Sequence, residues 1–157
     1  MENMVTNLEV IKECLTQKEW KFLCDDKKGF IAVGFNDAGI IFQVSEEQVE
    51  VQTCFFKEVP EEAYHEVSEY LNKVNPILKE GHFKVDPRKG IRYRIVSCVE
   101  KGTTIQASRV EEMLEIGSNM GGYFEEVVCR IIDEGVSAEK AFEETILKIL
   151  VSMEEAA

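Results

Sequence analysis

Apolar residues recur along the chain with two different periods. Near the N-terminus, Leu8, Ile11 and Leu15 are three and four residues apart, which predicts a helix over about residues 5–16. From there to residue 55 the apolar residues occupy every second position, which predicts β-strands. The alternating positions are Trp20, Phe22 and Cys24; Ile31, Val33 and Phe35; Ile40, Phe42 and Val44; and Val49, Val51, Thr53 and Phe55. The short segments between these strands cannot carry a crossover, so we predict an antiparallel meander.

A helix and a second hairpin follow the meander. Pro60 has a fixed φ and precedes two acidic residues, an arrangement that favours the start of a helix. Because the residue before a proline avoids helical dihedrals, the helix should end close to Asn75, before Pro76. Gly81 then leads into a hairpin whose apolar residues are Phe83, Val85, Ile91, Tyr93 and Ile95. We expect this hairpin to lie against the first sheet.

Helical periodicity returns beyond Gly102. Ser108 and Glu111 match a capping box, and Gly121-Gly122 interrupts the following apolar face as a kink or a close helix contact. Ser137 begins a last helix with a continuous apolar stripe, made of Ala138, Ala141, Phe142, Thr145, Ile146, Ile149, Leu150 and Met153. This order of elements predicts an α+β fold. No repeat or low-complexity linker divides residues 1–157, so we predict a single domain.

Composition limits the classes of partner and the compartment. The net charge of −12 disfavours nucleic acid, because binding to phosphates depends on Lys and Arg. The runs of uncharged residues are much shorter than the ~18 apolar residues that a membrane span needs, and the N-terminus lacks the pattern of a secretory signal. The five cysteines form no close pair, which indicates reduced thiols. We therefore predict a cytoplasmic protein without a nucleic-acid or membrane partner.

Residues suited to catalysis or metal binding are sparse. His65 and His82 are the only two histidines, and neither has a Cys or His at ligand spacing. Acidic pairs such as Asp25-Asp26 and Glu61-Glu62 fall in a turn or at a helix start, where acids are favoured for local reasons. We predict no catalytic residues, no metal site, no cofactor and no enzymatic activity.

Two surfaces remain as candidates for binding. Arg92 and Arg94 share one face of a strand, and Lys84 lies on the neighbouring strand, so together they form a candidate site for an anion or an acidic partner. Cross-strand charge pairing with Glu50 is the alternative interpretation. The last helix offers a second candidate, a partner or dimer surface made of Phe142, Ile146, Ile149 and Leu150. That stripe either packs in the core, joins two subunits or receives another protein.

The order of elements and several motifs resemble the YbjN-like family of bacterial proteins, whose fold is similar to that of type III secretion chaperones. The resemblance rests on Trp20 after the first helix and on IAVGF, IIFQV, VPEEAYHEVSEYLNKVN and GHFKVDPRKGIRYRI, and it covers about residues 5–134. It implies an antiparallel sheet of five to six strands with helices packed on one face. It also implies sensory regulation or chaperone-like binding of a partner, commonly as a homodimer. Residues 137–154 look like a helical extension of this core.

Two functions of different classes follow. The preferred one is a non-enzymatic protein-interaction module, a chaperone-like or regulatory adaptor of a bacterial cytoplasm that binds a polypeptide through a sheet face, a sheet edge or a helix groove. The alternative is a small-molecule-binding sensor, or an enzyme with a pocket between the helices and the sheet. A deep concave pocket with clustered polar side chains would favour the alternative, and a flat apolar patch would favour the interaction module.

Overall fold

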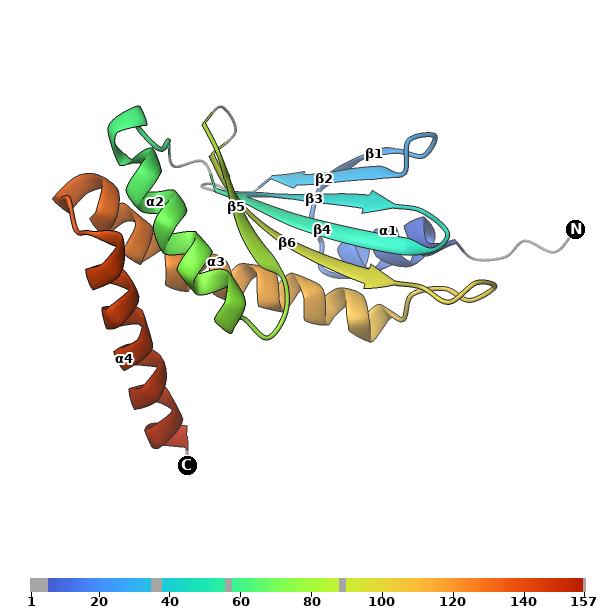
Figure 1. Ribbon diagram of the computed structural model, residues 1–157. Helices are drawn as coiled ribbons and strands as arrows, with labels where there is room; N and C mark the ends of the chain where they lie inside the picture. Colours follow the sequence, from blue (N-terminus) through green and yellow to red (C-terminus); the bar gives the residue numbers. More distant parts are fainter. Residues whose placement is uncertain (1–5, 35–37, 56–57, 88–89, 157) are drawn as a thin grey trace, which may run out of the picture.

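The computed structural model describes residues 6–34, 38–55, 58–87 and 90–156 (Figure 1). Its elements follow one another in this order: α1 (Asn7–Gln17), β1 (Phe22–Asp25), β2 (Phe30–Gly34), β3 (Ala38–Val44), β4 (Gln48–Phe55), α2 (Glu61–Val74), the short 3₁₀ helix η1 (Asn75–Ile77), β5 (His82–Asp86), β6 (Gly90–Cys98), α3 (Ala107–Glu134) and α4 (Ala138–Ala156). The predicted meander, hairpin and helices are therefore all present. Phe35, which the alternation assigned to the second strand, lies outside the described residues.

Six strands form one antiparallel sheet in the order β1-β2-β3-β4-β6-β5. The second hairpin continues the first sheet, because residues 91–98 of β6 pair with β4 and Ile95 faces Val51. Period-two alternation places one set of side chains on the core face, where Phe42, Val51 and Tyr93 are at most 1% exposed. These observations confirm the predicted α+β fold with a six-stranded sheet.

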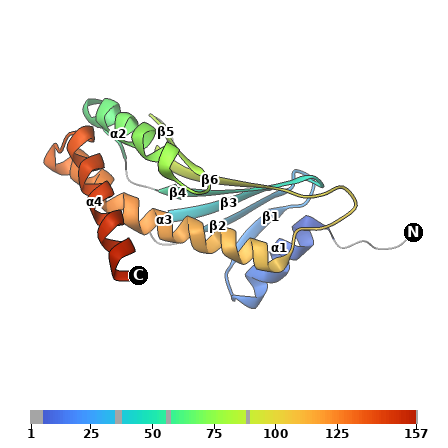
Figure 2. The same ribbon diagram turned by 60° about the horizontal axis from the view of Figure 1, so that its bottom comes forward.

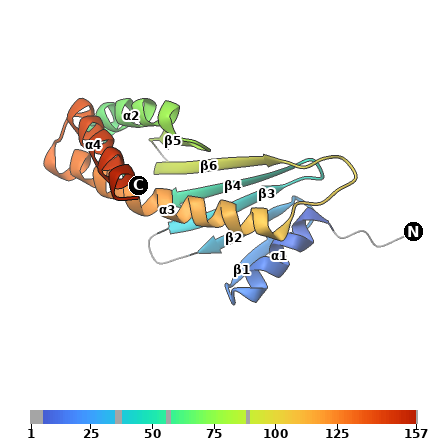
Figure 3. The ribbon, with the colours of Figure 1, turned by 90° about the horizontal axis from the view of Figure 1, so that it is seen from below.

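The helices cover one face and one edge of the sheet. Figures 2 and 3 show α1 and α3 lying across the same face, and we call the opposite face the outer face. At the β5 edge, α2 packs beside β5, and α4 packs against α2 and α3. The core lies between the sheet and these helices, where Val67, Leu71 and Met113 are at most 2% exposed.

The long helix α3 differs from its sequence prediction in two respects. It begins at Ala107 after Gln106, so Ser108 lies inside the first turn and the predicted capping box is wrong. It also runs as one helix of 28 residues through Gly121 and Gly122. A Cβ atom at Gly122 would meet nothing within 4 Å, whereas one at Gly117 would lie 2.6 Å from Oγ1 of Thr53 on β4. The glycine that allows close packing is therefore Gly117.

The joint between α2 and β5 depends on the side chain of Asn75. Its Nδ2 donates to the carbonyl of Phe83 at 2.9 Å, and its Oδ1 accepts from the N–H of Phe83 at 2.7 Å. Gly81 just before β5 has φ +75°, and a Cβ atom there would collide with the hydroxyl of Tyr93. The α-helix ends at Val74, close to the predicted stop, but Asn75 keeps helical dihedrals (φ −50°, ψ −45°) and the chain continues as η1. The expectation that Asn75 avoids helical dihedrals before the proline is therefore wrong. The asparagine thus ends one element and fixes the position of the next.

Candidate protein-interaction surfaces

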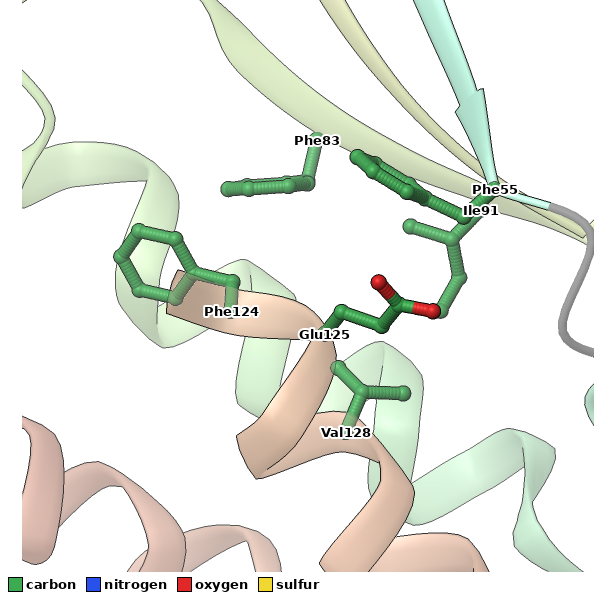
Figure 4. Close-up of a pocket in the computed structure, with 6 residues that line it drawn as sticks. All are labelled: Phe55, Phe83, Ile91, Phe124, Glu125 and Val128. Carbon is green, nitrogen blue, oxygen red and sulfur yellow. The ribbon is translucent and has the colours of Figure 1, made fainter. Parts of the chain in front are cut away.

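The cavity between α3 and the sheet is too small for a ligand. The internal cavity lined by Phe55, Phe83, Ile91, Phe124, Glu125 and Val128 has a volume of about 10 Å³, enough for one water molecule at most (Figure 4). The rings of Phe83 and Phe124 pack edge to face, with their centroids 5.1 Å apart. Larger hollows of about 760 Å³ and 560 Å³ are open at the surface. The seam between helices and sheet is therefore a packed core.

The residues with metal-binding chemistry are dispersed. His65 is exposed on α2, and His82 is exposed on β5. Within the described ranges, no three residues of the His, Cys, Asp or Glu type gather in a geometry that would hold a metal ion. None of the described helices combines the length and the apolar character that crossing a membrane requires.

The structure brings Lys84, Arg92 and Arg94 together on the outer face of β5 and β6. Lys84 lies directly opposite Arg92 in the ladder between these strands. Arg94 forms an ion pair with Glu50 of β4, whose side chain is 8% exposed, and Glu50 also accepts a hydrogen bond from Gln52. The alternative interpretation of cross-strand pairing with Glu50 therefore holds for Arg94.

Arg92 and Lys84 differ from Arg94 in having no carboxylate partner among the residues that the structure describes. Nη1 of Arg92 donates to the neutral Oε1 of Gln52 at 2.8 Å, while its buried Nε has no hydrogen-bond partner within the described ranges. Burial raises the pKa of the neighbouring Cys54 thiol, and the positive charge of Arg92 acts in the opposite direction by lowering it. Two of the three predicted cations thus keep a positive charge that no described acid neutralises.

The first half of α4 is fixed to the body of the protein by specific contacts. Its first N–H, from Ala138, donates to Oε2 of Glu66 on α2 at 2.7 Å, and Ser137 caps the helix by accepting from the N–H of Lys140. Farther along, Glu144 accepts from Arg130 of α3 at 2.6 Å. These contacts hold residues 138–145 against α2 and α3.

The second half of α4 exposes an apolar surface that we call the α4 patch. It consists of Leu147, Leu150, Val151 and Met153, which are 63%, 53%, 51% and 64% exposed. Figure 1 shows this end of α4 projecting away from the sheet. A cluster of large apolar side chains at this exposure is unusual on a monomer, which makes the α4 patch a candidate interaction surface.

The predicted stripe on the last helix is divided between core and surface. Phe142 packs against the core with Nζ of Lys73 lying 5.9 Å from its ring centre, and Ile146 and Ile149 are half-buried. Leu150 is exposed, as are Leu147 and Val151, which the prediction left out of the stripe. The signal for these two residues was the sequence ILKILVSM, which is apolar on more than one side of a helix.

Comparison with known proteins identifies the family. The family model described as "Putative bacterial sensory transduction regulator", YbjN, matches residues 7–129. The chain belongs to the YbjN family. Among curated protein sequences, none matches this member significantly.

Solved structures show the same fold for this YbjN-family protein. The crystal structure of YbjN from E. coli matches with a TM-score of 0.50 at 8% identity, over 79% of this chain and 97% of that chain. The crystal structure of the ExsC-ExsE complex contains a chain that matches with a TM-score of 0.58 at 11% identity, over 77% of this chain and 92% of that chain. The fold is thus that of YbjN and of the type III secretion chaperone ExsC, as the sequence predicted.

The α4 patch lies outside the part of the chain that the family model matches. The match ends at residue 129, inside α3, whereas α4 begins at Ala138. The extension predicted over residues 137–154 corresponds to this helix. The surface is therefore a feature of this YbjN-family protein beyond the matched core.

Proposed function

We propose that this YbjN-family protein is a non-enzymatic protein-interaction module, a chaperone-like or regulatory adaptor that works in a bacterial cytoplasm. The observation that carries the proposal is the α4 patch, whose four apolar side chains are each more than half exposed. Crystallisation of the related ExsC fold in a complex with ExsE supports a protein as the partner. The family description as a sensory transduction regulator supports a regulatory role.

The same patch supports a homodimer. A helix with an exposed apolar side needs a surface to bury it, and a two-fold dimer is the commonest closed arrangement. Two copies of α4 packed across a two-fold axis would cover Leu147, Leu150 and Val151 of each chain with the same residues of the other. The charge of −12 per chain opposes this association, but charges on outward faces are screened by salt, while apolar burial is not.

The small-molecule alternative receives less support. The cavity beneath the sheet holds at most one water molecule, and the larger hollows are open to solvent rather than enclosing. A binding site for a small ligand usually buries most of the ligand surface. An exposed apolar surface together with a packed interior favours binding to a polypeptide.

Light scattering tests the dimer. The wild type should have the mass of a dimer at about 100 µM, and the double variant Leu147→Glu/Leu150→Glu should have the mass of a monomer with an unchanged circular dichroism spectrum. Leu23→Glu is the matched control, because Leu23 is 78% exposed at the opposite end of the sheet order, on β1. This control should remain dimeric. A monomeric wild type, or a double variant that stays dimeric, would overturn the dimer at this surface.

Partner binding needs a separate measurement. Tagged wild type and the Leu147→Glu/Leu150→Glu variant are used to capture proteins from the native cell, and each captured protein is then purified and titrated against both forms. An adaptor should bind at least one such protein in the titration. If no purified protein binds the wild type, the interaction module is wrong, whatever the mass from light scattering.

A further inference from the structure

One row of paired residues crosses the outer face of the sheet. The strand registers place Gly34 opposite Gly39, Gly39 opposite Cys54, and Cys54 opposite Arg92, which in turn faces Lys84. Their neighbours along the strands, Val33, Ile40 and Phe55, are buried on the core face, so the row itself points outward. Each of the strands β2, β3, β4, β6 and β5 thus contributes one residue to a continuous row.

The middle of this row has small side chains or none. This leaves an open hollow in the outer face, which we call the trough. Gly34 and Gly39 contribute no side chain, and a Cβ atom built at Gly34 would meet nothing within 4 Å. The open hollow over these strands has a volume of about 560 Å³ and also contacts the apolar residues Leu23, Ala32 and Ile41. The trough therefore has a floor of small residues and an apolar side.

Among the residues that the structure describes, the charged ones that line this trough are all positive, although the chain as a whole carries −12. They are Lys21, immediately before β1, and Arg92 on β6, while Lys84 extends the row beyond Arg92. None of the three forms an ion pair with a described acidic residue. One row away, Arg94 is neutralised by Glu50, so on β6 the positive charge without a described acidic partner is that of Arg92, which lies at the trough.

We propose that the trough binds an extended acidic segment of a partner polypeptide, with carboxylates at Lys21 and at Arg92 and with small apolar side chains between them. This inference rests on the proposed function, the binding of a polypeptide, and specifies the chemistry of the segment. The trough is an open surface hollow rather than an enclosed cavity, which suits a polypeptide better than a small ligand.

The spacing of the strands sets the length of the segment. Lys21 and Arg92 are separated by four strand-to-strand steps of about 4.8 Å, or roughly 19 Å in total, which an extended chain spans in about six residues. Neighbouring rows of side chains on one face of the sheet are about 7 Å apart. This spacing is smaller than the ~10–12 Å diameter of a helix with its side chains. The geometry therefore fits an extended segment with two acidic residues six positions apart.

The probe is a capped, fluorescein-labelled peptide, Glu-Thr-Val-Thr-Val-Thr-Glu, whose acidic and valine side chains share one face when it is extended. Its binding is measured by fluorescence anisotropy at low and moderate salt, and a peptide with Lys in place of both Glu is the control probe. The Glu peptide should bind the wild type, more weakly as salt rises, and the Lys peptide should not bind. Failure of the Glu peptide to bind, or equal binding of the Lys peptide, would overturn the proposal.

Two variants separate the trough from the rest of the surface. A Cβ atom at Gly34 meets nothing within 4 Å, so Gly34→Val should place its side chain in the trough and abolish binding. Lys21→Gln/Arg92→Gln should weaken binding by about tenfold or more through lost charge-assisted hydrogen bonds. Lys79→Gln, which removes an exposed positive charge elsewhere, should leave binding unchanged. Wild-type affinity in the Gly34→Val variant would exclude the trough as the site.

Other occupants have distinct signatures. If Gly34→Val lowers the mass measured by light scattering, a second copy of the chain occupies the trough and the proposal is wrong. If decanoate binds the trough as tightly as the Glu peptide, the site is for a small amphiphile, and the proposal is also wrong. The Leu147→Glu/Leu150→Glu variant should bind the peptide like the wild type, so failure of the trough and failure of the α4 patch are distinguishable.

Discussion

The hydroxyl oxygen of Tyr70 on α2 lies 2.7 Å from that of Thr145 on α4, and both residues are at most 1% exposed. Thr145 uses its one hydrogen to donate to the carbonyl of Ala141 at 2.9 Å. Tyr70 must therefore be the donor to Thr145. This buried hydrogen bond links the family-matched core to the helix that carries the α4 patch, and so it fixes where the patch projects.

Removing the hydroxyl of Tyr70 and removing that of Thr145 should lower the free energy of unfolding by different amounts. Tyr70→Phe deletes the donor and leaves Thr145 bonded to Ala141, so we expect a loss of about 1 kcal/mol in the free energy of unfolding. Thr145→Val leaves the hydroxyl of Tyr70 buried without an acceptor, which should cost about 1–3 kcal/mol. Urea denaturation monitored by circular dichroism measures both values. A larger loss for Tyr70→Phe than for Thr145→Val would contradict this assignment of donor and acceptor.

Alkaline pH should weaken the fold through the same tyrosine. Burial raises the pKa of Tyr70 to about 12 from a usual value near 10. Between these two pH values the folded state retains a proton that the unfolded state releases, so the free energy of unfolding falls as pH rises. The contribution is fully present below about pH 10 and is lost through about pH 12. Burial raises the pKa of Tyr93 to about 12 as well, so both residues act in the same direction.

Comparison with Tyr70→Phe isolates this effect from other alkaline titrations. The wild type should be the more stable protein at pH 8, and its advantage should shrink as pH rises above about 10, because the variant has no phenol to ionise at this position. Urea midpoints taken across the pH series give the difference. A constant advantage up to pH 12 would show that Tyr70 has no raised pKa.

Two glycines of α3 should respond to alanine in opposite directions. A Cβ atom at Gly122 has open space, so Gly122→Ala should stabilise the helix by about 0.5–1 kcal/mol. At Gly117 the added Cβ lies 2.6 Å from Oγ1 of Thr53, and Gly117→Ala should destabilise by about 1 kcal/mol or more after the gain in helix propensity. A double variant with Thr53→Ala should recover most of the loss. Additive effects of Gly117→Ala and Thr53→Ala would rule out the close contact.

The sequence predicted the elements of the fold better than their contacts. Alternation reports which face of a strand is apolar, so the sheet was accessible from local pattern. The end of α2 close to Asn75 was predicted too, although Asn75 itself keeps helical dihedrals. The contact of Gly117 with Thr53 joins residues 64 positions apart, and no local signal distinguishes it from Gly122. Local pattern offered a kink or a close contact at Gly121-Gly122 and did not point to Gly117, where the close contact lies.

The candidate surfaces show the same division. The sequence placed Lys84, Arg92 and Arg94 on one face because period two is local, but the neutralisation of Arg94 depends on the register of β4 against β6. Lys21 was not associated with them, because it reaches the same row only through the pairing of β1 with β2 and of β2 with β3. Similarly, periodicity marked α4 as apolar, but the direction in which it packs on α2 decides that Phe142 is covered and Leu150 is exposed.

Salt should strengthen the dimer that the α4 patch supports. Each chain carries −12, and the range of the repulsion between two chains shrinks from about 30 Å at 0.01 M to about 8 Å at 0.15 M ionic strength. Burial of Leu147, Leu150 and Val151 does not depend on this screening, so the dissociation constant should fall as salt rises. Sedimentation or light scattering across a concentration series at each ionic strength measures it, and the monomeric Leu147→Glu/Leu150→Glu variant is the control. Weaker association at higher salt would mean that ion pairs, and not the apolar patch, hold the two chains together.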